Sequence, residues 1–550
     1  MMNVLKGMGC LLAALGAVGA VEAGATRGLV TENGTTRYVV SVPAGEDDTL
    51  TADDVAAMEG HPLHKTGDGT LRAGDVMAAF DGDIHVEAGV YRAETSNALG
   101  TSAGETYVTG GTLLNRVASS SDSTKISFKN EHIHLAGTGY DNQGALRTEV
   151  SAQDFCRKVT FEGDVRITGT QRLDFRYTAF DMKGHTLTTS FTGNGLYLVG
   201  LKGDLANMGD IMVERGELQF QSTVNGTSAD RTVTFAPAGG LTFWTSTSKL
   251  VSTFVFGAGS YISAAADPFK LEGTDDRAIL AGTVRLDGPV SLSSARNHQV
   301  QLRGYVTGPG GFTGGRGGWL QLNGPTNDFQ GGLSLAGVAG TACTTGGVVV
   351  YANGAIPKDG GALALKNAAF WNWSTTAVDL PDFTADGHVT VTGRTAQAAV
   401  TAKSLVKTGD GPLDVALPLK VLGTTDIQGG TLRFTARVPD LVPGLNYFFN
   451  MGTRGNVKWS TVPSRAASQG TDSTGVTYAY REWPWGDAQE HYYTGYIRVP
   501  GEEGEPVICN FMTSIARDCT VIIGGVTCAQ FEDNKNVKDN VVVGYAARLS

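Results

Sequence analysis

The sequence contains little charge and, after its N-terminal segment, no long hydrophobic run. Charged residues make up 18% of the chain and give a formal net charge of −11, so the sequence lacks the basic surface that a nucleic-acid backbone requires. No later segment reaches the roughly 18 consecutive apolar residues that span a bilayer. We therefore expect no nucleic-acid partner and no transmembrane segment in the mature chain.

Cysteine is also scarce, with 6 in 550 residues. Cys156 and Cys343 are isolated in the sequence, whereas Cys509, Cys519 and Cys528 lie close together near the C-terminus. A disulfide within this group would suit an oxidising compartment. Buried free thiols in strands fit the spacing equally well, so both alternatives stay open.

The N-terminus has the pattern of an export signal. Lys6 precedes an apolar run from Leu11 to Val21, which ends at a small-residue site, Val21-Glu22-Ala23. The pattern predicts that residues 1–23 are a signal peptide and that the mature protein is secreted or lies on the outer cell surface.

Glycine is abundant, at 75 of the 550 residues, which is about twice the roughly 7% of an average protein. The hydrophobic content of 41% argues against disorder. The glycines belong to internal repeats. The segment 65–69 (Lys-Thr-Gly-Asp-Gly) recurs at 407–411, the segment 82–89 is similar to 209–216, and a looser copy begins at Gly310.

Each repeat consists of short alternating segments separated by glycine. In Ile84-His85-Val86 and in Leu320-Gln321-Leu322, apolar and polar residues alternate, which is typical of strands with one buried face. The glycines permit the positive φ angles of sharp corners. Strand, corner and strand on a period of about 25 residues indicate a solenoid, in which each coil buries its inner face by stacking on the next.

These motifs resemble the autotransporter-associated β-strand repeat. Residues 63–93 and 405–434 match its Lys-Thr-Gly-x-Gly opening and its closing Gly-Thr-Leu well, and residues 310–357 match moderately. The resemblance implies a passenger-type, right-handed parallel β-helix over about residues 30–440. We assign residues 24–440 to this domain.

After residue 440 the repeats stop and aromatic residues become frequent. Alternating stretches at 493–499 and 519–523 predict a small antiparallel β-sandwich-like domain over 441–550. The order of Tyr493–Ile497, a strand near 507–511 and Thr520–Gly525 weakly resembles a protective-antigen-type carbohydrate-binding module. Because the chain stops at Ser550, we expect this module to be incomplete.

The sequence offers few residues for ligand chemistry. Trp371, Trp373, Trp483 and Trp485 would stack on sugar rings if exposed, and would pack in a core if not. His132 and His134 lie two apart on a predicted strand, so their rings share a face. Since no third ligand is identifiable beside them, the pattern favours solvent-facing residues and predicts no metal site.

Catalytic motifs are equally weak. Gly100–Gly104 spells a nucleophile elbow outside any strand–turn–helix context. Acidic groups at 46–54 and 81–87 are the residue types that glycoside hydrolysis uses, but acids are also common at turns and caps. We expect no catalytic residue and no cofactor.

The sequence thus predicts a structural or adhesin-like repeat protein without catalytic activity. The alternative is a carbohydrate-active β-helix enzyme, a polysaccharide lyase or glycoside hydrolase, or a carbohydrate-binding surface protein. The expected partner is an extracellular polysaccharide or the surface of a host or neighbouring cell.

Overall fold

The computed structural model describes residues 24–434 with internal gaps, and eight strands between 446 and 549. The gaps in the first range are 122–125, 203–204, 206, 222–226, 245–248, 265–277, 294–297, 316, 339–345 and 395–397. The predicted signal peptide, residues 1–23, lies outside the described residues.

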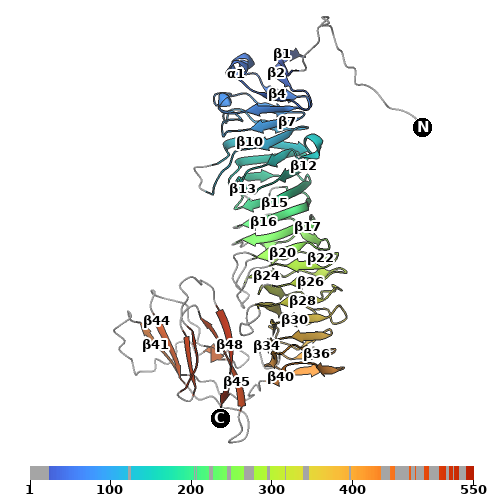
Figure 1. Ribbon diagram of the computed structural model, residues 1–550, viewed down its shortest axis with the longest axis vertical. Helices are drawn as coiled ribbons and strands as arrows, with labels where there is room; N and C mark the ends of the chain where they lie inside the picture. The colour runs from blue at the N-terminus through green and yellow to red at the C-terminus, as the bar shows by residue number, and fades with distance from the viewer. Residues whose placement is uncertain are drawn as a thin grey trace, which may run out of the picture.

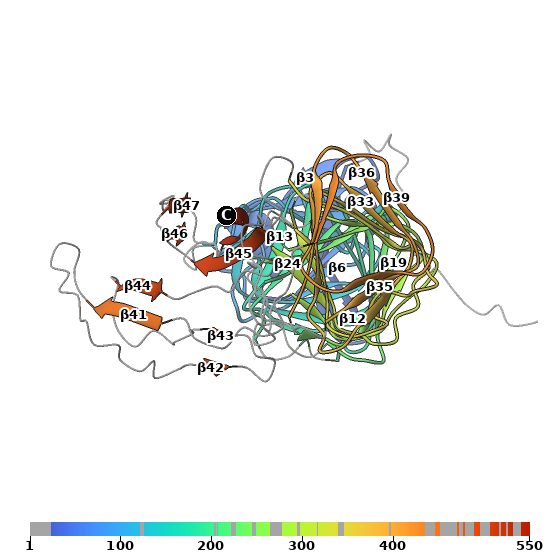
Figure 2. The ribbon, with the colours of Figure 1, turned by 90° about the horizontal axis from the view of Figure 1, so that it is seen from below.

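Residues 24–434 form one elongated column of stacked coils (Figure 1). The column is a parallel β-solenoid of about 16 turns, and helix makes up only about 4% of the chain. Viewed along the column, the coils surround a common interior (Figure 2). The predicted all-β solenoid is therefore confirmed, whereas its right-handed sense stays a prediction.

Three parallel ladders of strands form most of the wall. The first ladder stacks β2 (Thr35–Ser41), β4 (Leu63–Thr66), β6 (Ile84–Val86), β8 (Thr106–Val108), β10 (Phe128–Gly137), β12 (Cys156–Gly169) and β14 (Ala179–Asp181).

The second ladder stacks β3 (Asp47–Thr49), β5 (Thr70–Ala73), β7 (Val90–Ala93), β9 (Thr112–Asn115), β11 (Leu146–Thr148), the end of β12, β15 (Leu187–Val199), β16 (Ile211–Gln221), β17 (Thr232–Trp244), β19 (Thr253–Phe256), β22 (Val284–Leu286) and β25 (Val306–Thr307).

The third ladder stacks β13 (Leu173–Arg176), the ends of β15, β16 and β17, β20 (Tyr261–Ala264), β23 (Val290–Leu292), β26 (Phe312–Gly314), β28 (Leu333–Ala336), β30 (Leu363–Lys366), β33 (Phe383–Asp386), β36 (Leu405–Thr408) and β39 (Thr425–Ile427).

Two further parallel sheets complete the later coils. The longer one contains β18 (Lys249–Leu250), β21 (Ile279–Leu280), β24 (Gln299–Leu302), β27 (Trp319–Leu322), β29 (Gly347–Val350), β31 (Ala369–Asn372), β34 (Val389–Gly393), β37 (Pro412–Val415) and β40 (Thr431–Phe434). The shorter one contains β32 (Val378–Leu380), β35 (Val400–Ala402) and β38 (Leu419–Val421).

Alternation along the strands explains the core. Ile84 and Val86 of β6 are fully buried while His85 between them faces outward, and the pattern recurs from coil to coil. The buried apolar residues form one continuous cluster from Tyr38 to Leu417. Each coil therefore completes its core with its neighbours, as expected for a solenoid.

The repeated Lys-Thr-Gly-Asp-Gly motif forms a corner whose lysine points inward. Lys65 is fully buried, and its Nζ donates to the carbonyl oxygens of Thr66, Gly67 and, in the next coil, Ala88 at 2.8, 2.7 and 3.0 Å. Gly89 has φ +61°, and a Cβ there would lie 2.7 Å from Lys65 Nζ. The lysine and the glycine one coil later therefore form a matched pair.

The second copy repeats this arrangement. Lys407 is also fully buried, and its Nζ donates to the carbonyls of Thr408 and Gly409. Gly430, with φ +70°, leaves room for the ammonium group, since a Cβ there would lie 2.9 Å from Lys407 Nζ. In both copies a buried ammonium group thus satisfies carbonyl groups of the corner.

A small cap covers the N-terminal end. β1 (Thr26–Glu32) pairs antiparallel with β2, and α1 (Ala52–Met58) begins with a capping box between Thr51 and Asp54. Asp54 is buried, but hydrogen bonds from Arg27, Thr51 and Tyr38 outweigh burial and hold the pKa of its carboxyl below the usual range. The cap protects the first coil edge from pairing with other chains.

Two short 3-10 helices, η1 (Asp75–Met77) and η2 (Tyr140–Asn142), lie in connections between strands. No helix in the described part of the chain is long and apolar enough to cross a membrane.

In the C-terminal region, four antiparallel strand pairs are described. They are β41 (Asn446–Met451) with β44 (Gln489–Thr494), β42 (Gly470–Thr471) with β43 (Thr477–Tyr478), β45 (Val507–Ile515) with β48 (Val541–Leu549), and β46 (Cys519–Ile523) with β47 (Val526–Phe531). The side chains here lie outside the described residues, so the sandwich-like domain and the cysteine pairing stay predictions. Cys156, in the solenoid, is a buried free thiol.

Candidate functional site

Of the tryptophans considered for sugar contacts, Trp371 and Trp373 lie among the described residues, on or just after β31. Trp371 on β31 is only 1% exposed and packs with Trp319, Val349 and Ala369. The ring of Trp373 lies beside that of Trp371, with their centroids 6.3 Å apart. The Arg394 guanidinium lies 5.7 Å from the centroid of the Trp373 ring. Trp371 thus has no ring face open to solvent, and packing, the expected alternative, describes its surroundings.

Trp483 and Trp485 lie outside the described residues. The Gly100–Gly104 motif lies in an irregular connection without a following helix, and Thr101 there hydrogen-bonds Asp81.

The acidic residues of the segments 46–54 and 81–87 make ion pairs and hydrogen bonds within the fold. In the N-terminal group, Asp47 pairs with Arg72 and Asp48 with Arg27. In the second group, Asp83 accepts a hydrogen bond from the Glu105 backbone at 2.9 Å. These contacts match the turn and cap role that the sequence analysis kept as the alternative to hydrolysis.

His132 and His134 both lie on the outer face of β10, as their spacing predicts. Their side chains are only 13% and 10% exposed, so the expectation that they face solvent is wrong. The structure brings Glu105 against both rings, and this carboxylate is the third ligand type that the sequence did not reveal. The separation in sequence concealed it, because the length of the connection between β8 and β10 decides which residues become neighbours.

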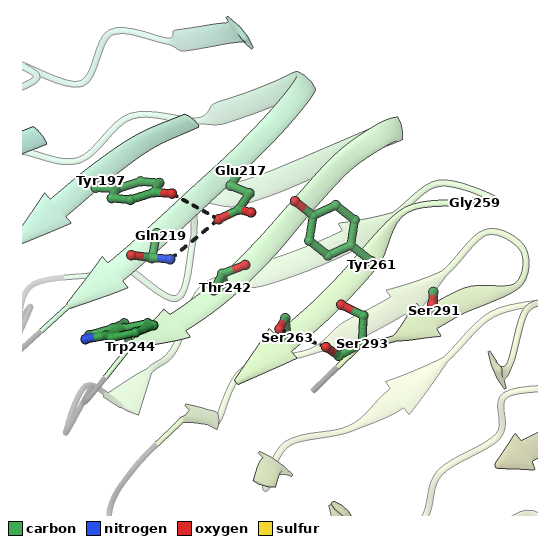
Figure 3. A pocket seen from close by; sticks show the side chains of 10 residues that line it. All are labelled: Tyr197, Glu217, Gln219, Thr242, Trp244, Gly259, Tyr261, Ser263, Ser291 and Ser293. Atoms are coloured by element: carbon green, nitrogen blue, oxygen red, sulfur yellow. Dashed lines mark hydrogen bonds between the residues drawn. The ribbon is translucent and has the colours of Figure 1, made fainter. Parts of the chain in front are cut away.

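An aromatic groove opens on the outer face of the third ladder, between β15 and β23. It encloses about 550 Å³, and its walls come from five consecutive coils. The lining residues are Tyr197, Glu217, Gln219, Thr242, Trp244, Gly259, Tyr261, Ser263, Ser291 and Ser293. Figure 3 shows their side chains projecting from neighbouring strands into one shared space.

The strand register builds two polar rows along this groove. Tyr197, Gln219, Thr242 and Ser263 are aligned across four strands. The second row aligns Glu217, Gly240, Tyr261 and Ser291. Inward residues such as Leu218 and Leu241 alternate with these rows and anchor the strands in the core.

Gly240 determines how the Tyr261 ring lies. A Cβ at residue 240 would come within 2.1 Å of the ring carbon that carries the Tyr261 hydroxyl. The tyrosine ring therefore extends over the preceding strand, toward Glu217, which is the neighbour of Gly240 in the register. A side chain larger than glycine would displace the ring from the groove.

Trp244 supplies the most exposed aromatic surface of the groove. It ends β17, and 46% of its surface is accessible to solvent. Figure 3 shows its indole near Thr242, at one edge of the residues that line the groove. An exposed indole beside hydroxyl groups is a surface for a ligand with one apolar face and polar edges.

Glu217 is the one carboxylate that lines the groove in the part of the chain that the structure describes. Its Oε2 accepts from the Tyr197 hydroxyl at 3.4 Å and from Gln219 Nε2 at 3.5 Å. Burial and, next, the Glu217 charge raise the pKa of Tyr197 and of Tyr261. Both phenols therefore keep their protons at neutral pH, and Tyr197 uses its proton to donate to Glu217.

An arginine–aspartate cluster bounds the groove at its N-terminal end. The Arg172 guanidinium lies 4.3 Å from the centre of the Tyr197 ring and bonds Asp174 with two 2.6 Å contacts. Asp174 also bonds Arg176 at 3.0 Å, yet burial raises the pKa of its carboxyl above the usual range. This cluster holds the first aromatic ring in position.

The groove combines aromatic surface, hydroxyl groups, one amide and one carboxylate. Sugar rings present C–H groups on one face and hydroxyls around the edge, so this set is suited to them. Once the structure is known, the residues of the groove can be recognised in the sequence. Segments 216–221, 239–244 and 260–264 align by their inward Leu218, Leu241 and Ile262, and their intervening residues form the groove.

No protein-family model, no curated protein and no solved structure matches this chain. The autotransporter-associated repeat and the carbohydrate-binding module therefore stay predictions from the residues that resemble them.

Proposed function

We propose that this chain is a secreted or cell-surface, adhesin-like structural protein whose solenoid holds a polysaccharide in the groove of the third ladder. The protein scaffolds and binds its ligand without transforming it. The observation that carries the proposal is the exposed Trp244 ring, which lines one groove with Tyr261 and with rows of hydroxyl and amide groups from five coils.

The length and openness of the groove favour a polymer over a small ligand. Successive coils repeat about every 4.8 Å, close to the length of a sugar unit, so adjacent coils offer similar groups to adjacent units. Export is supported by the signal-peptide pattern of residues 1–23. Mass spectrometry of the chain recovered from medium and surface fractions tests it, since an unprocessed chain retained inside the cell contradicts export.

Binding is tested with soluble polysaccharides, such as glucans, xylan, chito-oligosaccharides, alginate and pectin, by affinity electrophoresis and calorimetry. For the glycan that binds, we expect Trp244→Ala and Tyr261→Ala each to weaken affinity about fivefold, since an aromatic contact contributes about 1 kcal/mol. Tyr305→Ala is the matched control, because Tyr305 is exposed but does not line the groove. Equal affinity of all variants, or no binding by the panel, contradicts the proposal.

A carbohydrate-active enzyme is the second candidate, and Glu217 between two tyrosine hydroxyls is the observation in its favour. Glycoside hydrolysis ordinarily uses two carboxylates, and Glu217 is the only one among the described residues that line the groove. An enzyme would release reducing ends or unsaturated products from the bound glycan, and Glu217→Gln would abolish release while leaving binding in place. A wild-type chain that binds and releases nothing excludes this candidate.

A further inference from the structure

Three side chains from neighbouring coils direct nitrogen and oxygen atoms to one point on the outer face of the first ladder. His132 Nδ1 lies 2.7 Å from Glu105 Oε1, and His134 Nε2 lies 3.0 Å from Glu105 Oε2. All three ligand atoms lie within 4.8 Å of one another. This site is on a different ladder from the groove and shares no residue with it.

The fold brings these residues together by strand alternation and register. Ile133 and Leu135 of β10 point into the core, so His132 and His134 point outward. Ile133 lies opposite Thr106 of β8, which places Glu105 beside His132. The arrangement therefore depends on backbone pairing between coils and not on a loop.

The second nitrogen of each imidazole is also held. His132 Nε2 lies 2.9 Å from Thr160 Oγ1, and His134 Nδ1 lies 2.8 Å from Glu162 Oε1. Metal-binding histidines characteristically have an oxygen partner on the nitrogen that does not face the metal, because this bond sets the tautomer and the ring orientation. Both rings have such a partner.

The carboxylates are oriented in the same manner. The Tyr107 hydroxyl donates to Glu105 Oε2 at 2.7 Å, and Lys183 Nζ donates to both oxygens of Glu162 at 2.8 Å. The His side chains are mostly buried, whereas the Glu105 side chain is 40% exposed. An ion would therefore reach the site from the Glu105 side and retain water there.

We propose that Glu105, His132 and His134 bind one Zn²⁺ ion, with water as the fourth ligand. Two imidazoles and one carboxylate are a known donor set for zinc, whereas Ca²⁺ and Mg²⁺ prefer oxygen ligands alone. Tetrahedral bonds of about 2.0–2.2 Å separate ligand atoms by about 3.4 Å, so the Glu105 carboxylate moves outward by about half an ångström. The ion then links the coil of β8 to the coil of β10.

A hydrogen-bonded network without metal is the competing explanation of the same contacts. In that network His134 donates from both ring nitrogens, to Glu105 and to Glu162. With zinc, Nε2 coordinates the ion and Nδ1 keeps its bond to Glu162. The two explanations differ in whether the chain takes up one equivalent of metal at this position.

The test uses the full tag-free chain, stripped with chelator, loaded with ZnCl₂ and dialysed before metal analysis. We expect one tightly held Zn²⁺ per chain in the wild type, and Co²⁺ in its place should give the visible absorption of a four-coordinate site. Glu105→Gln and His132→Gln should each lower zinc affinity at least tenfold. Circular dichroism should show that both variants keep the wild-type fold.

His64→Gln is the matched control, because His64 also pairs with a glutamate, Glu87, at 2.8 Å but does not belong to the three-residue cluster of Glu105, His132 and His134. This variant should bind zinc like the wild type. A wild-type chain that retains no zinc, or zinc uptake unaffected by Glu105→Gln and His132→Gln, overturns the proposal and leaves the hydrogen-bonded network.

Discussion

Residues 63–93 and 405–434 are two copies of one repeat, and their interiors agree more closely than their exteriors. In both copies a buried lysine donates to corner carbonyls, and a glycine with positive φ one coil later leaves room for its ammonium group. Lys65 has three such bonds and Lys407 two. The motif therefore encodes how one coil is joined to the next.

The outer faces of the two copies differ. In the first copy His64 stacks on His85, with ring centroids 4.3 Å apart, and the row continues through Tyr107 to His134. In the second copy the aligned outward residues are Val406 and Asp426. The comparison teaches that the repeat specifies the interior, whereas outward positions vary and are available for binding.

The largest expected effect comes from the glycine of the first copy. In Gly89→Ala the new Cβ would lie 2.4 Å from the Gly69 carbonyl oxygen and 2.7 Å from Lys65 Nζ. A side chain at positive φ costs about 1 kcal/mol of stability, and overpacking costs about 1–3 kcal/mol. We therefore expect the free energy of unfolding by denaturant to fall by about 3 kcal/mol.

Gly430→Ala provides the comparison. It meets similar atoms, but the strands of its coil, β39 and β40, are largely exposed and able to shift. We expect a loss of about 1 kcal/mol, visible mainly as faster amide exchange in that coil. Equal losses at both glycines would show that the position in the column does not matter.

The next largest effect is that the contribution of Lys65 to stability depends on pH. Burial lowers the pKa of Lys65 to about 8 from 10.5. Between these two values the unfolded chain binds more protons than the folded chain, so stability rises with pH across this window. The cost of Lys65→Met should therefore increase by about 2 kcal/mol from pH 7 to pH 10, measured by denaturant unfolding.

Lys407→Met should show the same sign, because burial also lowers the pKa of Lys407. A cost of Lys65→Met that is constant with pH would mean that the ammonium group is not penalised by burial.

The sequence was sufficient for the parts of the fold that follow from local pattern. Alternation and glycine spacing predicted strands, corners and stacking, because each depends on neighbouring residues. The inward direction of Lys65 was not predictable in this way, since a lysine beside glycines and an aspartate reads as a solvated turn. Only the carbonyls of its own corner and of Ala88 explain its burial.

The candidate sites depend on register, which the sequence does not display when connections differ in length. Glu105 and His132 become neighbours although more residues separate the paired positions of β8 and β10 than separate those of β6 and β8. Tyr261 comes to lie over Gly240 through the pairing of β17 with β20, and Trp244 lines the same groove. The burial of Trp371 could not be inferred from the sequence of its strand either, because all four residues of β31 are buried and do not alternate.

A smaller effect distinguishes the interiors themselves. The closing segment has Tyr91 in the first copy and Leu432 in the second. Tyr91 is fully buried, and its hydroxyl donates to the Ala98 carbonyl at 2.6 Å. Tyr91→Phe leaves that carbonyl unpaired, so we expect a loss of about 1–2 kcal/mol in denaturant unfolding. No loss would indicate that water replaces the hydroxyl.

The smallest expected effect lies on the exterior and tests whether outward positions are independent of folding. His85→Ala removes the middle ring between His64 and Tyr107, whose centroids lie 4.3 and 4.9 Å from that of His85. Such ring contacts contribute about 0.5–1.5 kcal/mol, so the variant should lose about 1 kcal/mol in thermal or denaturant unfolding. Asp426→Ala, at the corresponding outward position of the second copy, should lose almost nothing, because Asp426 is exposed. A loss above 3 kcal/mol for His85→Ala would mean that the ring row is part of the fold, and the outer face of the first copy would then be no freer to vary than its interior.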